Sequence, residues 1–124
     1  AMSDESIEQE IQAKGANVAP RVTPADIEAN IASTFYFTAA QGAEKAARDN
    51  GSYAAGTPAE GQALGLLTFC VLVLRNGFTV TGESACASPE NFDAEIGRKI
   101  ARHNAVAKIW PLMGYELRSK LAAA

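Results

Sequence analysis

The feature that most constrains the fold is a run of apolar residues followed by an Asn-Gly pair. Residues Leu66–Leu74 are almost entirely apolar, and Asn76-Gly77 comes two residues later. Asn-Gly supplies the two positive-φ residues of a two-residue type I′ turn, so the chain should return as an antiparallel strand over 78–84. The sequence therefore predicts a β-hairpin over about 66–85.

A two-residue turn also predicts which residues of the two strands face each other. Val73 should pair with Val80, and Val71 with Gly82, on the face opposite Cys70. The first strand is apolar on both faces, and an isolated hairpin cannot cover that much apolar surface. A third strand, a packed helix or a second copy of the chain must cover it, which favours a homo-oligomer.

The chain holds two cysteines, Cys70 and Cys86, which are too few for a disulfide scaffold. The expected register puts them on opposite faces of the hairpin, so we expect no bond between them.

A long helix is expected after the hairpin, over about 89–110. Ser88-Pro89-Glu90 combines a capping serine with a proline that suits a first helical turn. One row of side chains recurs at steps of three and four and should lie on the sheet: Phe92, Ile96, Ile100, His103, Ala107 and Trp110. A second row, Gly97, Ala101 and Ala105, is small enough to admit another element closely.

Pro111 should break or kink this helix after Trp110. Residues Leu112–Leu121 then read as a shorter helix turned against the first.

The chain before the hairpin contains a second capped helix, expected over about 24–35. Thr23-Pro24-Ala25-Asp26 places a capping threonine, a first-turn proline and an acidic residue at its start. Ile27, Ile31 and Phe35 then form an apolar stripe at helical spacing. Residues 35–38 fit either the last turn of this helix or a short strand.

Two segments carry weaker structural signals. Residues 1–22 are acidic and should form a flexible extension, although Ile7 and Ile11 would suit a short helix. Residues 39–65 are rich in Ala and Gly and are expected to be a loop, with one or two helical turns over 43–48. The predicted fold is a single α+β domain over 23–121, with a small antiparallel sheet packed on the long helix.

Bulk composition excludes several classes of protein. The formal net charge of −3 argues against a protein that binds duplex nucleic acid through general basicity. The longest apolar run, over 64–74, is too short to span a bilayer, so no membrane partner is expected. Basic residues nevertheless gather on the long helix, where a small anion could bind.

Three motifs in fixed order carry a family resemblance: NGF-x-V-x-G-x-S-A, NFD-x-E-x-GRKIA and IWPL-x-GY. LRNGFTVTGESACASPENFDAEIGRKIARHNA, followed by KIWPLMGYEL, is similar to a family of small tailed-phage and prophage proteins (N-four-like gene product forty-nine and Sf-six-like gene product sixty-six). The resemblance covers roughly 66–121 plus TPADIEANI, and leaves 39–65 outside. It implies phage origin and expression in the host cytoplasm, not a particular reaction.

The layout is also similar to the first type of Thoeris anti-defence proteins, which are small phage oligomers that sequester cyclic nucleotide immune signals. The shared features are a small sheet and a following helix with two arginines four residues apart, here Arg98 and Arg102.

The candidate ligand-binding residues are Arg75, Phe78, Arg98, Lys99 and Arg102. Arg98 and Arg102 lie one helical turn apart and would repel each other unless an anion, a carboxylate or solvent separates them. They form either a solvated surface with Glu95 as local partner or a phosphate clamp, with Lys99 or Arg75 beside it. Phe78, at the turn, either covers one end of the core or stacks on a base or a partner.

Catalysis, a metal and a cofactor are not expected. The single histidine, His103, lies on the apolar stripe and should be buried and hydrogen-bonded. No second histidine or Cys/His/Asp spacing suggests a zinc site or a catalytic triad. Cys70 should be inert, while Cys86 near a helix start could be mildly activated.

The sequence therefore favours a non-enzymatic phage accessory protein that acts by binding. The most concrete version sequesters a cyclic nucleotide immune signal at Arg98 and Arg102. The alternative is a protein–protein inhibitor of a host enzyme or defence complex, acting through the acidic N-terminus and an exposed sheet face.

Overall fold

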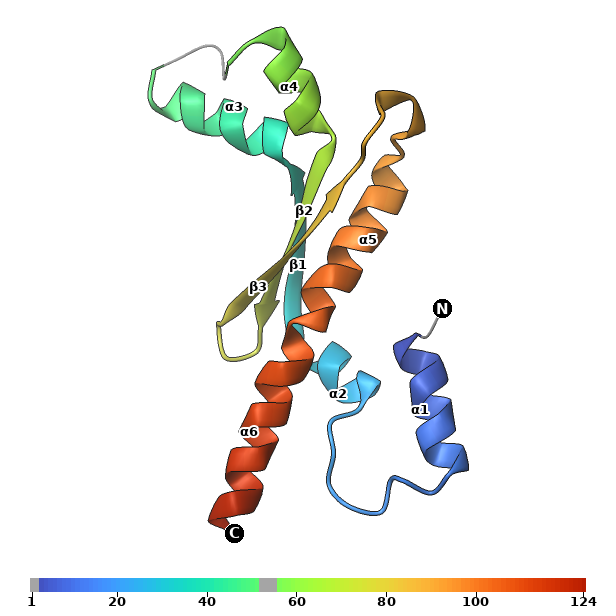
Figure 1. Cartoon of the computed structure of the whole chain (residues 1–124). Helices are drawn as coiled ribbons and strands as arrows, with labels where there is room; N and C mark the ends of the chain where they lie inside the picture. The colour runs from blue at the N-terminus through green and yellow to red at the C-terminus, as the bar shows by residue number, and fades with distance from the viewer. Residues whose placement is uncertain (1–2, 52–55) are drawn as a thin grey trace.

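The computed structural model describes residues 3–51 and 56–124 and confirms the α+β class (Figure 1). A three-stranded antiparallel sheet lies against a long helical stretch, with further helices at both ends of the sheet. The elements are α1 (Asp4–Ala13), α2 (Pro24–Ala29), β1 (Ile31–Thr38), α3 (Ala39–Asp49), α4 (Pro58–Gly65), β2 (Leu67–Leu74), β3 (Thr79–Ala85), the 3₁₀ turn η1 (Pro89–Asn91), α5 (Ala94–Ala107) and α6 (Ile109–Ala123).

The third strand that the apolar β2 required is β1, which pairs with the side of β2 away from β3. The prediction of a helix over 24–35 was therefore wrong beyond Ala29. Helix α2 ends at its C-cap Asn30, and the β-branched and aromatic residues that follow favour an extended chain. Of the two alternatives for 35–38, the strand is correct.

The hairpin exists as predicted, but its turn is one residue longer. The Gly77 N–H donates to the Leu74 carbonyl at 2.9 Å, and the Leu74 N–H donates to the Phe78 carbonyl at 2.8 Å. Gly77 has φ 88°, whereas Asn76 is not among the described residues with positive φ, so the turn is not type I′. A three-residue loop ending in a left-handed glycine replaces it.

This extra loop residue shifts the register by one and so reverses the face of every β3 side chain. Val80 pairs with Leu72 and Gly82 pairs with Cys70, instead of Val73 and Val71. Val80 and Gly82 therefore point into the core, on the same face as Cys70.

The same register corrects the placement of the two cysteines. Cys86, whose N–H donates to the Leu66 carbonyl, continues the ladder on the same face as Cys70. Both thiols are free, as predicted. The reason is distance along the strand, about 13 Å for four residues, and not opposite faces.

Helix α5 packs on the sheet through its row of small residues, not through the larger row. Gly97, Ala101 and Ala105 are buried, whereas Ile96 and Ile100 are 56% and 46% exposed. The prediction that the larger row lies on the sheet was therefore wrong.

Gly82 of β3 explains this choice of face. A Cβ built on Gly82 would lie 2.1 Å from the Ala101 carbonyl oxygen and 2.2 Å from the Ala105 nitrogen. The helix backbone thus touches the strand backbone, which only small residues on both sides permit. The small row was predicted to admit another element closely, and strand β3 is the element that packs closely against it.

The core lies between α5, the first turn of α6, α2 and the inner face of the sheet. Its fully buried larger side chains are Ile27, Leu72, Ile109 and Cys70. Partly buried residues pack around it: Val22, Ile31, Val106, Trp110 and Met113.

The long helical stretch starts later and ends later than predicted. Pro89 begins only a 3₁₀ turn, and α5 begins after Asp93, whose carboxylate accepts from the Ile96 N–H at 3.0 Å. Pro111 falls in the first turn of α6, where its missing N–H costs no helical bond. Figure 1 shows α6 continuing the direction of α5, so the predicted turned-back helix is wrong.

The Ala- and Gly-rich segment forms two helices in its described part, and the prediction of a loop over 39–65 was wrong there. Thr38 and Thr57 each cap a helix start through the N–H three residues on. Helices α3 and α4 project from one end of the sheet. Residues 52–55 lie outside the described part.

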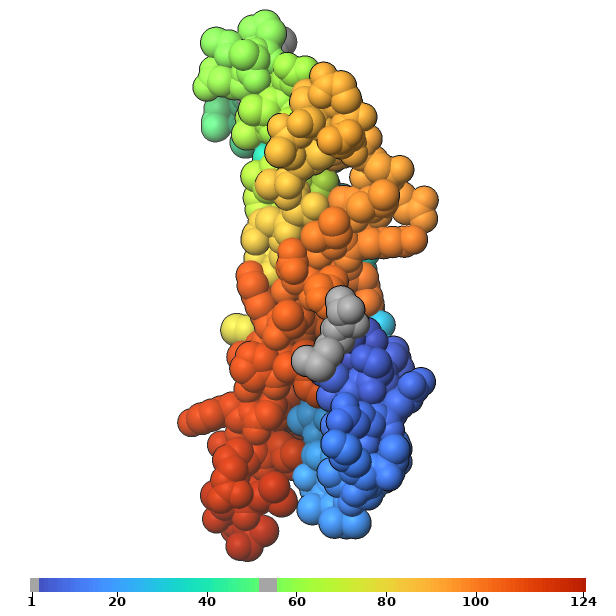
Figure 2. Space-filling model, turned by 45° about the vertical axis from the view of Figure 1, so that its right-hand side comes forward, coloured from blue at the N-terminus to red at the C-terminus, as the bar shows by residue number. Residues whose placement is uncertain are grey.

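The N-terminal segment contains the short helix that Ile7 and Ile11 allowed, α1. Figure 2 shows this blue segment lying against the lower part of the orange-red C-terminal stretch. Trp110 Nε1 donates to Asp4 Oδ2 at 3.1 Å, and Arg21 pairs with Glu8. No helix in the described ranges combines the length and apolarity needed to cross a membrane.

Candidate functional site

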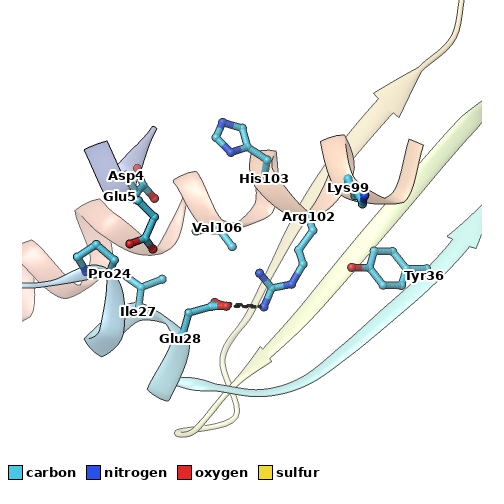
Figure 3. Close-up of a pocket in the computed structure, with 10 residues that line it drawn as sticks. All are labelled: Asp4, Glu5, Pro24, Ile27, Glu28, Tyr36, Lys99, Arg102, His103 and Val106. Atoms are coloured by element: carbon cyan, nitrogen blue, oxygen red, sulfur yellow. Dashed lines mark hydrogen bonds and ion pairs between the residues drawn. The ribbon is translucent and has the colours of Figure 1, made fainter. Parts of the chain in front are cut away.

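Two open clefts meet at Tyr36, beside the face of α5 that looks toward β1. The first, here called the α2-side cleft, has a volume of about 370 Å³ (Figure 3). It is lined by Asp4, Glu5, Pro24, Ile27, Glu28, Tyr36, Lys99, Arg102, His103 and Val106. The second, here called the α3-side cleft, has about the same volume, 370 Å³, and is lined by Tyr36, Phe37, Thr38, Gln41, Gly65, Thr68, Phe92, Ala94 and Arg98.

The α2-side cleft already contains a neutralised arginine. Arg102 lies between α5 and α2, and its Nη2 is 3.1 Å from both carboxylate oxygens of Glu28 (Figure 3). Asp4 and Glu5 also line the cleft. Since acidic groups outnumber the lysine and arginine there, an added anion would face repulsion as well as attraction.

The α3-side cleft is better suited to an anion. Among the described residues, Arg98 is the one charged residue that lines it, and none of their carboxylates forms an ion pair with Arg98. The amino ends of α3 and α5 border the cleft at Thr38 and Ala94, where partial positive charge gathers.

The same cleft also has the apolar and polar groups that small-molecule sites combine. Tyr36 and Phe92 supply aromatic surface. Gln41 and Thr68 supply hydrogen-bonding groups in fixed positions. A flat, aromatic, negatively charged molecule would satisfy all of these groups together.

Tyr36 stands between the two arginines. Burial raises the pKa of its phenol, while the charges of Arg102 and Arg98 act in the opposite direction. Burial likewise raises the pKa of the Cys70 thiol beneath it, against the pull of Arg102. At neutral pH the Tyr36 hydroxyl is therefore a proton donor, and Cys70 is the unreactive thiol that was predicted.

The structure brings together three of the five predicted ligand-binding residues. Arg98 and Arg102 flank Tyr36 from successive turns of α5, and Lys99 lines the α2-side cleft. The alternative of a solvated surface is met at Arg98, which is exposed, but its expected partner Glu95 pairs with Lys99 at 3.3 Å.

Arg75 and Phe78 do not join this group, because both lie at the hairpin turn. Arg75 Nε donates to the Ala29 carbonyl at the end of α2, at 2.9 Å. Phe78 is 56% exposed, so it does not cover the core end. Of the two predicted roles of Phe78, contact with a base or a partner is the one that its exposure allows.

Two further predictions about single residues are corrected or extended. His103 is exposed and not buried, because the larger row of α5 faces away from the sheet. In Figure 3 its imidazole points away from Arg102.

Cys86 donates a hydrogen bond from Sγ to the Ser88 carbonyl at 3.2 Å. Within 3–51 and 56–124, no three His, Cys, Asp or Glu side chains lie close enough to hold a metal ion.

Sequence reasoning missed most of the α3-side cleft. Tyr36, Phe37 and Thr38 were ambiguous because four residues cannot distinguish a helix turn from a strand. The sequence predicts Phe92 on the helix stripe and Gln41 in a loop. The consecutive aromatics at 35–37 were the available signal, since a strand must place one of them on the opposite face from the other two.

Fold and cleft together define a small α+β protein with a cationic, aromatic surface site. The chain belongs to the phage protein (N4 Gp49/phage Sf6 gene 66) family, whose model matches residues 22–121. The match runs through α3 and α4, which the sequence resemblance had left outside. No curated protein matches the chain. No solved structure matches it.

Proposed function

We propose that this phage protein acts by binding, without catalysis, and that it sequesters a cyclic nucleotide immune signal of the host. The observation that supports this most is the position of Arg98 and Arg102 on either side of Tyr36. A phosphate would neutralise Arg98, which has no ion-pair partner among the described residues, and charge-assisted bonds from the guanidinium groups would hold it.

The proposal gives each part of the α3-side cleft a role. Arg98 binds a phosphate at the amino ends of α3 and α5. Phe92 stacks on a base, and Gln41 and Thr68 bond to its edge. Arg102 contributes a second bond to the ligand after it releases Glu28. Part of the free energy of this bond therefore offsets the loss of the Arg102–Glu28 ion pair.

Calorimetry with cyclic ADP-ribose and cyclic di-AMP tests the proposal. The Arg98→Ala/Arg102→Ala double variant should bind about 100-fold more weakly, since each charge-assisted bond contributes roughly 1.5–3 kcal/mol. Arg118→Ala, at an exposed position of α6, is the matched control and should bind as the native protein does. Absence of heat with either ligand, or equal affinity in the double variant, would rule out this site.

The alternative is inhibition of a host protein through the outer face of the sheet. Phe35 and Phe37 on β1 face the same side as Phe69, Val71 and Val73 on β2, and Phe37 stacks on Phe69 at 5.6 Å between ring centroids. Phe35 remains 56% exposed on this face. Exposed apolar patches of this kind mark interaction sites.

A pull-down from host lysate separates the two functions. A single stoichiometric host protein that is retained by native protein and lost with Phe35→Lys would favour inhibition. Retention that survives Phe35→Lys, or no retained protein at all, would remove the support for it.

A further inference from the structure

The two edges of the sheet differ in how they are protected. At the β3 edge, Asn104 Nδ2 donates to the Glu83 carbonyl at 2.8 Å, and Lys108 Nζ lies 3.5 Å from Thr81 Oγ1. Charges and side-chain hydrogen bonds of this kind keep an edge strand from pairing with another chain. Helix α5 therefore closes the β3 edge.

The β1 edge is protected only at its ends in the described structure, by a register irregularity between Ile31 and Ser33 and by a hydrogen bond from the Thr38 N–H to Gln41 Oε1. Its sequence, IASTFYFT, contains no charge and no proline over eight residues. Within the described ranges β1 pairs with β2 alone. Phe35 is 56% exposed, and Tyr36 and Phe37 are each 39% exposed. An uncharged aromatic edge of this length is a template for another strand.

We propose that two copies of the chain pair through antiparallel β1 edges to form one continuous six-stranded sheet. A two-fold axis perpendicular to the sheet makes the two β1 strands antiparallel and keeps both α5 helices on one side. A strand without charges can face its own copy without like-charge repulsion.

The charges that flank the edge are complementary under this symmetry. Glu28 and Asp26 lie on α2, at the Ile31 end of β1, while Arg98 lines the cleft at the Thr38 end. A two-fold axis near the middle of β1 places the acidic end of one copy beside the basic end of the other. Arg98, which has no ion-pair partner in the described part of its own chain, then faces Glu28 of the second copy. That carboxylate is shared with Arg102 of its own chain, because each of its oxygens can accept more than one hydrogen bond.

The aromatic strand supplies part of the contact area that a stable dimer needs. With about 150–250 Å² per aromatic side chain, the open parts of Phe35, Tyr36 and Phe37 amount to roughly 250 Å² in each copy. A standard interface buries about 800 Å² per partner. The remainder must come from the backbone edges and from α2 of one copy against α3 of the other, which the symmetry brings together.

If the proposed function holds, the dimer would also bring residues of both copies into one binding site. The inner face of β1, with Tyr36, becomes the floor of a groove between two α5 helices, so that the arginines of both copies face it. A guanidinium has five donors, enough for a carboxylate of the second copy and a phosphate of the ligand. The dimer itself does not depend on any ligand.

Native mass spectrometry and sedimentation without added nucleotide test the pairing. The native protein should have twice the 13.0 kDa mass of one chain. Phe35→Lys should be monomeric, because two lysines would meet near the axis. Phe78→Lys is the control, since Phe78 is equally exposed at 56% but lies on the hairpin turn, and it should stay dimeric. Circular dichroism must show native helix content in each variant.

A charge exchange tests the register. Arg98→Glu and Glu28→Arg should each lose the dimer when alone, because like charges then meet at both contacts. An equimolar mixture of the two should recover the doubled mass, because opposite charges meet at both contacts of the mixed pair. Glu28→Gln, which removes the pair with Arg102 without adding a like charge, should keep more of the dimer than Glu28→Arg does. Arg118→Glu should remain dimeric.

A monomeric native protein, a dimer that survives Phe35→Lys, or a mixture that stays monomeric would each overturn the proposed pairing. Each result is independent of nucleotide binding. A monomer that binds cyclic nucleotide would retain the proposed function without the dimer, and a dimer without ligand binding would retain the pairing alone.

Discussion

At the scale of single residues, Gly82 determines which face of α5 meets the sheet. Its missing side chain lets the helix backbone approach, and the small row of α5 follows from that approach. Hydrophobicity alone ranks Ile96 and Ile100 above Gly97 and Ala101, which is why the larger row was expected to be buried. The backbone contact could be found only from the corrected register, because the type I′ register turned Gly82 to the other face.

Gly82→Ala should destabilise the fold by roughly 3 kcal/mol or more, because the added methyl group meets helix backbone that cannot rotate away. Gly114→Ala is the control, since its Cβ would meet no atom within 4 Å and it lies inside α6. It should stabilise the protein by about 0.5–1 kcal/mol. Urea denaturation measures both changes, and equal midpoints for the two variants would contradict the close contact.

The candidate site also shows what the sequence can predict about residues. Arg98 and Arg102 were recognisable because a spacing of four places two charges on one helical face. Tyr36 and Phe92 were not, because their positions depend on where β1 begins and where η1 ends. Local spacing predicts neighbours on one element, whereas a cleft joins several elements.

At the scale of elements, capping residues predicted where helices start better than the composition of the surrounding segment did. Thr23 begins α2 as predicted, and Thr38 and Thr57 begin two helices in a segment that composition had assigned to a loop. The exception is Ser88, whose side chain makes no capping bond. Asp93 makes that bond instead, and α5 begins there.

Asp93→Ala should therefore cost about 1 kcal/mol of stability, the usual effect of losing an N-cap. Ser88→Ala should change stability by no more than about 0.5 kcal/mol. Chemical denaturation of the two variants in parallel decides between the two helix starts. A larger loss of stability for Ser88→Ala than for Asp93→Ala would indicate that the helix starts at Ser88, as the sequence predicted.

The attachment of α1 should depend on pH through Glu8. Hydrogen bonds from Arg21 and Gln12 lower the pKa of Glu8 from 4.5 to about 2. Because the folded-state pKa is the lower one, this stabilisation is complete above about pH 4.5 and is lost as the pH falls toward 2.

The one tryptophan of the chain reports this change, because Trp110 is bonded to Asp4 of α1. Its fluorescence should change between pH 4.5 and 2, and Glu8→Gln should show the low-pH signal already at neutral pH. Glu10→Gln, which removes only the exposed pair with Lys14, should behave as the native protein does. Identical profiles for the two variants would contradict the role of Glu8.

At the scale of the whole molecule, the sequence predicted the class and the hairpin but not the arrangement of the chain around them. The apolar character of β2 on both faces correctly required another element, and β1 is that element. The aromatic edge and outer face of β1 remain exposed in a single chain. The exposed strand that favours a homo-oligomer is therefore β1 and not β2. Pro111 was misleading for a similar reason, because its effect depends on whether it falls inside a helix or in a first turn.

The central claim is that Arg98 and Arg102 hold an anionic nucleotide beside Tyr36. The most direct measurement is the NMR spectrum of the arginine Nε–H groups during titration with cyclic di-AMP and with cyclic ADP-ribose. We predict that one of these ligands shifts the Arg98 and Arg102 signals in a saturable way and leaves that of Arg118 unchanged. No shift at Arg98 and Arg102 with either ligand, or an equal shift at Arg118, would contradict the claim.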